Sequence, residues 1–214
     1  MRSRTTAAAV LPTVAALLLT ACGGSDSQGP QVEPRSPDAT AAATSTAAPA
    51  GDRINRPEIK LPSDVQDVFE GGTTGDPTED AVLADNAQRI SSITEAITVE
   101  AKEHPALRFY SKGDALASAA LFVKSFYDRD RSYVGKARYY DREVKLLADG
   151  AAQVTYCEDG TQTYPKDRKT GAVDRSIKGS ASDYANYVTR LERDGRSVWQ
   201  TTSVSSTGSA KRCM

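Results

Sequence analysis

The chain has 214 residues and nearly balanced charge, with 27 basic and 28 acidic side chains. A general nucleic-acid binder needs a clear basic excess, so this composition argues against that class. Every aromatic residue lies at or after Phe69, so the segment before it cannot build a hydrophobic core, whereas the rest of the chain can.

The N-terminus reads as a targeting segment. Arg2 and Arg4 precede an apolar run over 7–19, which is too short for a bilayer core that needs about 20 residues. The tetrapeptide Leu-Thr-Ala-Cys that ends at Cys22 resembles a bacterial lipobox. The resemblance implies a signal peptide over 1–21, lipid on Cys22, and anchoring to the extracytoplasmic face of the cell membrane. An ordinary signal peptide with a nearby Cys is the alternative.

The segment 22–56 is rich in Ala, Pro, Ser and Thr and buries too little apolar surface to offset its ordering entropy. We expect a disordered tether, with a sugar-bearing Ser/Thr/Pro stalk as the alternative. We expect 57–214 to form a single domain with its core over about 76–213.

Helical signals come first in this domain. Asp76 suits an N-cap, Pro77 suits the first helical position, and apolar residues then recur at three- and four-residue steps. The spacing predicts a helix over Pro77–Glu103. A short helical piece over 106–110 and a helix over 113–128 follow.

The apolar period changes after Ser132. Strands are expected over 133–147, 151–157, 182–193 and 197–206, with an extended region over 162–174. Ala148-Asp149-Gly150 and Asp194-Gly195 are hairpin turn signals, and Glu158-Asp159-Gly160 predicts a further turn. The fold class is therefore α+β, with N-terminal helices packed on a bent antiparallel sheet of four or five strands.

This order of elements resembles the cystatin-like cone of the nuclear-transport-factor-2-like superfamily. The whole chain resembles secreted actinobacterial lipoproteins of unknown function with this fold. The residues that carry the resemblance, besides the lipobox, are Asp67-Val68-Phe69-Glu70-Gly71, Asp80-Ala81-Val82-Leu83-Ala84-Asp85, Val154-Thr155-Tyr156-Cys157, Val198-Trp199-Gln200-Thr201 and Ala210-Lys211-Arg212-Cys213. The group implies no activity, although related enzymes enclose a pocket with an Asp, His or Tyr deep inside.

Aromatic residues of the predicted strands are the candidates for such a pocket: Tyr139, Tyr156, Tyr187 and Trp199. The alternative is that they fill a sheet-on-helix core. His104, the single His, is expected as a structural cap at a helix C-terminus. The strand carboxylates that could face inward are expected on the solvent face: Asp141, Glu143, Asp183 and Glu192. We therefore assign no catalytic residue, metal ligand or cofactor.

Cysteine usage predicts one disulfide. With Cys22 lipidated, Cys157 and Cys213 remain, and export places them in an oxidising compartment. Two unrelated buried thiols are the alternative.

The leading functional hypothesis is a membrane-anchored lipoprotein with a non-catalytic domain that binds a small apolar ligand or a cell-envelope protein. The alternatives are an isomerase-, cyclase- or dehydratase-type enzyme, and a structural cell-envelope spacer. A deep pocket with a buried Asp or Glu of raised pKa would favour the enzyme, and a filled cone would favour the spacer.

Overall fold

The computed structural model describes residues 54–214. The predictions on the signal peptide and on Cys22, and those on the tether as far as residue 53, lie outside the described residues. Residues 54–56 differ from the predicted tether, because Ile54 packs against a buried apolar cluster and Arg56 pairs with the buried Asp85. None of the helices within 54–214 combines the length and apolar character needed to cross a bilayer.

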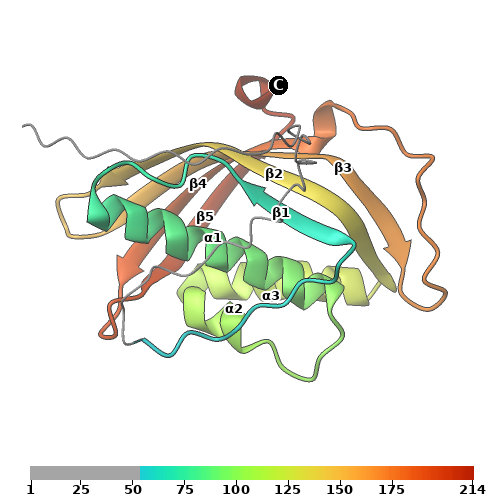
Figure 1. The fold of residues 1–214 in the computed structure, drawn as a ribbon, viewed down its shortest axis with the longest axis horizontal. Helices are drawn as coiled ribbons and strands as arrows, with labels where there is room; N and C mark the ends of the chain where they lie inside the picture. The colour runs from blue at the N-terminus through green and yellow to red at the C-terminus, as the bar shows by residue number, and fades with distance from the viewer. Residues whose placement is uncertain (1–53) are drawn as a thin grey trace, which may run out of the picture. The chain divides into compact units, whose positions relative to one another are not determined.

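The described residues form an α+β domain, which confirms the predicted fold class (Figure 1). Its elements, in chain order, are β1 (Val65–Phe69), α1 (Pro77–Thr98), α2 (Pro105–Tyr110), α3 (Gly113–Tyr127), β2 (Arg131–Leu146), β3 (Ala152–Asp167), β4 (Tyr184–Arg193) and β5 (Trp199–Gly208). A short 3-10 helix, η1 (Ala181–Asp183), precedes β4, and a second one, η2 (Lys211–Cys213), follows β5 near the C-terminus.

The sheet has the order β1-β2-β3-β4-β5 and is mixed, not purely antiparallel as predicted. Strands β2 to β5 form an antiparallel meander, whereas β1 pairs parallel to β2. The strands predicted from the sequence did not include one over Val65–Phe69. Parallel pairing is possible here because the three helices form a crossover connection between β1 and β2.

Strand β3 continues through Glu158–Gly160, so the turn predicted there is wrong. Both β2 and β3 are 16 residues long and pair along their whole length. The polar side chains of the supposed turn find partners within the sheet: Arg138 on β2 forms an ion pair with Asp159 at 3.3 Å, and the Asp159 carboxylate accepts the Thr161 N–H. Sheet pairing therefore overrides the local turn signal.

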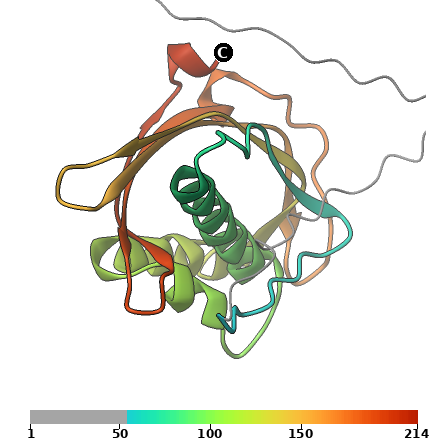
Figure 2. The same cartoon turned by 60° about the vertical axis from the view of Figure 1, so that its left-hand side comes forward.

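The sheet curves around α1, which lies along its concave face (Figures 1 and 2). Irregular pairing in β2, between Lys136 and Arg138 and between Tyr140 and Glu143, strengthens this bend, because a bulge increases local twist. The main core joins α1 to the sheet, and its largest members are Val82, Leu83, Ile90, Tyr139, Val154, Tyr156, Leu191 and Trp199.

The N-terminus of α1 is as predicted, because the Asp76 carboxylate accepts the N–H groups of Thr78 and Glu79. The helix ends at Thr98, however, before the predicted Glu103. The Tyr127 hydroxyl of α3 donates to the carbonyl groups of Ala96 and Val99, which satisfies the end of the helix at that point.

Cys157 and Cys213 form a disulfide with a Cα–Cα distance of 5.5 Å, which confirms the predicted pairing. The bond holds η2 against β3, and the Tyr140 hydroxyl donates to the Cys213 carbonyl. The C-terminus is thereby closed back onto the sheet.

Replacing both cysteines, as Cys157→Ser with Cys213→Ser, should lower the free energy of unfolding. The bond closes a segment with a sequence separation of 56, for which chain entropy predicts about 4 kcal/mol. Urea denaturation of the oxidised wild type and of the double variant measures this difference. Reduced wild type is the control and should match the variant, and equal stability of the oxidised wild type and the variant would contradict a stabilising clamp.

Candidate ligand-binding cavity

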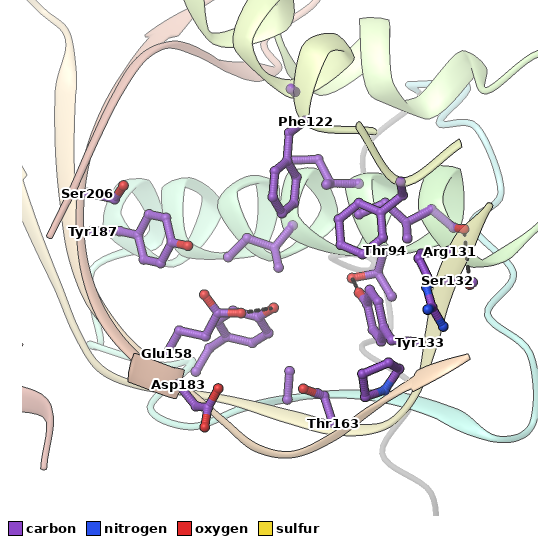
Figure 3. A pocket seen from close by; sticks show the side chains of 18 of the residues that line it. Thr94, Phe122, Arg131, Ser132, Tyr133, Glu158, Thr163, Asp183, Tyr187 and Ser206 are labelled. Atoms are coloured by element: carbon purple, nitrogen blue, oxygen red, sulfur yellow. Dashed lines mark hydrogen bonds between the residues drawn. The ribbon is translucent and has the colours of Figure 1, made fainter. Parts of the chain in front are cut away.

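A cavity of about 940 Å³ lies between α1, α3 and the inner face of the sheet (Figure 3). Its apolar wall comes from the two helices, with Ile90, Ile93 and Ile97 on α1 and Phe122 and Phe126 on α3. The isoleucines follow the three- and four-residue spacing that predicted the helix, so one helical face supplies them all. The cavity occupies the end of the sheet that the main core leaves unfilled.

Three of the predicted pocket residues line the cavity: Tyr139 on β2, Tyr156 on β3 and Tyr187 on β4. The rings of Tyr156 and Tyr187 stack with their centroids 5.0 Å apart, and Tyr139 meets Tyr156 edge to face at 6.1 Å. Neighbouring strands thus place a continuous aromatic surface opposite α1.

Trp199 does not line the cavity, and this part of the prediction is wrong. It is 5% exposed and belongs to the filled core, where its backbone N–H donates to the Asp85 carboxylate at 2.8 Å. The pairing of β4 with β5 shifts by one residue at Thr202. Because each step along a strand reverses the face, Val204 and Ser206 point into the cavity beyond this shift.

Glu158 on β3 is a carboxyl group of the cavity wall that sequence reasoning missed. The Tyr139 hydroxyl donates to its Oε1 at 3.3 Å, and the Tyr187 side chain points toward it (Figure 3). Burial raises the pKa of Glu158, although both tyrosine hydroxyls act in the opposite direction. The predicted turn concealed it, but alternation along a continuous strand puts Glu158 on the same face as Tyr156.

Arg89 on α1 also lines the cavity, although its side chain is almost fully buried at 5% exposed. Within residues 54–214, its Nε has no hydrogen-bond partner and no carboxylate forms an ion pair with it. Burial lowers the pKa of the guanidinium, and the nearby Tyr156 and Tyr187 oppose that shift. Ile93 lies four positions after Arg89, a spacing that places both on one helical face.

A hydrogen-bond chain runs from the cavity wall to a buried carboxyl group. The Tyr133 hydroxyl donates to Thr94 Oγ1, and the Thr94 hydroxyl donates to Asp67 Oδ1, both at 3.2 Å. Asp67 on β1 is 9% exposed, and its Oδ2 has no partner within the described residues. Burial is the main reason that the pKa of Asp67 rises to about 6.

Of the four strand carboxylates expected on the solvent face, Asp183 instead lines the cavity from η1, and it accepts the Ser180 N–H at 2.7 Å. The other three, Asp141, Glu143 and Glu192, do not line the cavity. His104 lies at the N-cap of α2 and not at a helix C-terminus as predicted, since α1 ends earlier. Within residues 54–214, no His, Cys, Asp and Glu side chains gather in a group that could hold a metal ion.

No protein-family model matches the chain, and no curated protein matches its sequence. Among solved structures, the chain is similar to the intermembrane space region of the chloroplast protein ARC6. The identity is 15% and the TM-score is 0.39, and the match covers 61% of this chain and 95% of that one.

The cavity combines broad apolar and aromatic walls with a few converging polar groups. This composition is typical of small-molecule sites, in which apolar contact provides affinity and the polar groups fix orientation. Chemically, the site offers a buried cation at Arg89 and a carboxyl group of raised pKa at Glu158.

Asp67 should make stability depend on pH in a distinctive direction. Its folded-state pKa, about 6, exceeds the ordinary value of 3.8, so the folded protein binds more protons than the unfolded chain between these values. Stability due to this group therefore rises as pH falls through 6, and is complete below 3.8.

The variant Asp67→Asn lacks this titration and should be more stable than wild type at pH 7.5. The shift corresponds to about 3 kcal/mol at most, and the difference should close as the pH approaches 4. Urea denaturation of both proteins at several pH values measures it, because groups common to both cancel. A difference that stays constant with pH would contradict the assignment.

Proposed function

We propose that the chain is a lipid-anchored protein of the extracytoplasmic membrane face whose domain binds a small, largely apolar molecule. The cavity of about 940 Å³ carries this proposal. Its volume lies at the upper end of the range of small-molecule sites, about 300–1,000 Å³. The aromatic surface formed by Tyr139, Tyr156 and Tyr187 and the isoleucines of α1 suit a flat or flexible apolar molecule.

The finer fold assignment, a cystatin-like cone, belongs to the same proposal. A curved sheet around one long helix, with the three α-helices preceding four of the five strands in the chain, supports it. The unfilled interior disfavours a purely structural spacer. An unfilled cavity lacks packing contacts, and this lowers the free energy of unfolding. A protein with a purely structural role would have no reason to retain it.

The location rests on the N-terminal sequence. The lipobox-like segment ending at Cys22 supports the anchor, and the disulfide between Cys157 and Cys213 suits an oxidising compartment. A diacylglycerol group with a further acyl chain would hold the chain at the membrane without a spanning helix.

The binding proposal is tested by native mass spectrometry of the full chain purified from its own host. We expect a small molecule retained by the folded protein and released on unfolding. Ser118→Trp should abolish the retention, because Ser118 lines the cavity and the indole would occupy its space. Ala117→Trp is the matched control, since Ala117 is exposed on the same helix and outside the cavity. Equal retention in both variants would contradict binding in this cavity.

The anchor is tested separately with Cys22→Ala. Without the thiol, no lipid can be attached, so the chain should lose its lipid mass and remain unprocessed or leave the membrane. Membrane fractionation and intact-mass measurement follow both outcomes. A Cys22→Ala protein that stays membrane-bound with the mass of the wild type would contradict lipidation at this residue.

Glu158 favours an enzyme of isomerase, cyclase or dehydratase type as the second candidate. A carboxyl group of raised pKa beside tyrosine hydroxyls could move a proton in a site shielded from water. Glu158→Gln distinguishes the two functions once the retained molecule is known. A binding domain should return that molecule unchanged with either residue, whereas an enzyme should convert it in the wild type and not in the variant.

A further inference from the structure

We propose that the molecule bound in the cavity carries a single carboxylate on an apolar body, and that Arg89 binds this carboxylate. The inference rests on the proposed binding function and specifies its ligand.

Arg89 is a buried arginine in the wall of the cavity. A buried charge is costly unless an opposite charge or several hydrogen bonds compensate for it. Arg89 is 5% exposed, and among residues 54–214 its Nε has no hydrogen-bond partner and no carboxylate pairs with it. Its side chain also forms part of the cavity wall. A ligand in the cavity can therefore supply the missing anion directly to the guanidinium.

The neighbouring protein groups do not neutralise this cation. Tyr156 and Tyr187 lie beside Arg89, but burial raises the pKa of both hydroxyls, so both remain uncharged at neutral pH. Glu158 shares the cavity, yet its carboxyl group interacts with the hydroxyl groups of Tyr139 and Tyr187 instead. The charge of Arg89 is available to a ligand for this reason.

The chemistry of the ligand follows from the groups around the cation. A guanidinium presents its N–H donors in a planar fork that matches both oxygens of a carboxylate. Beyond the cation, the wall is formed by the α1 isoleucines and by Phe122 and Phe126, which suit an apolar body. Asp174, Asp183 and Glu158 also line the cavity and would repel a second acidic group.

The two other arginines of the cavity differ from Arg89. Both Arg129 and Arg131 are exposed, so water already solvates their charge. Arg129 donates to Ser125 Oγ at 3.1 Å and stacks over Phe126 at 5.7 Å. Neither therefore gains as much from a ligand anion as the buried Arg89 does.

The test compares 11-(dansylamino)undecanoic acid with its methyl ester, which keeps the apolar body and removes the charge. Fluorescence titration of the full chain should show the acid binding roughly 10- to 100-fold more tightly than the ester. Arg89→Met should abolish this preference and leave ester affinity unchanged. Arg89→Lys should retain part of it, because the charge remains and the fork is lost. Arg131→Met is the matched control and should keep the wild-type preference.

Each outcome bears on the inference. Equal affinities of acid and ester for the wild type would overturn it while leaving the cavity a binding site. Absence of saturable binding of both probes would count against the proposed function and the inference together. Loss of the preference in Arg131→Met would show that the exposed Arg131 binds the carboxylate, and this would overturn the role of Arg89. Thermal unfolding checks that Arg89→Met is folded, and if it is not, Arg89→Lys carries the test.

Discussion

The position of α1 within the curve of the sheet determines most of the remaining structure. Asp85 fixes this position, because its buried carboxylate accepts the Trp199 N–H of β5 and pairs with Arg56, which precedes β1. At that end, Val82, Leu83 and Trp199 fill the space between helix and sheet. A single helix about 10 Å wide cannot fill a curved sheet along its whole length. The other end, which α3 spans, is left as the cavity.

The cavity and its surroundings contain three buried polar groups that differ in how completely hydrogen bonds or opposite charges compensate them. Glu158 is compensated by tyrosine hydroxyls, Asp67 has one oxygen bonded and one without a partner in the described chain, and Arg89 has no compensating charge within residues 54–214. Asp67 and Arg89 depart from the rule that buried polar groups are paired. Departures of this kind gather where a protein acts on another molecule, because function and not folding explains their retention.

The disulfide acts on the same strand as the site without entering it. Along β3, Tyr156 and Glu158 face the cavity and Cys157, between them, faces outward, since successive side chains alternate. Cys157 is bonded to Cys213, so the outer face of the strand is braced by the C-terminus. The bracing limits movement of the segment that carries Glu158, and preorganised polar groups bind a ligand with less loss of entropy.

Local signals in the sequence determined the helices, the hairpin turns, the Asp76 cap and the three tyrosines of the wall. The disulfide followed from counting thiols in an exported chain. Glu158 was misplaced because sheet pairing overrode a turn signal. Trp199 was misplaced because it belongs to the filled core and does not line the cavity. The parallel pairing of β1, and the lack of an anion from residues 54–214 beside Arg89, depend on residues far apart in sequence. Only tertiary packing decides such features, because local propensity carries no information about which distant groups meet.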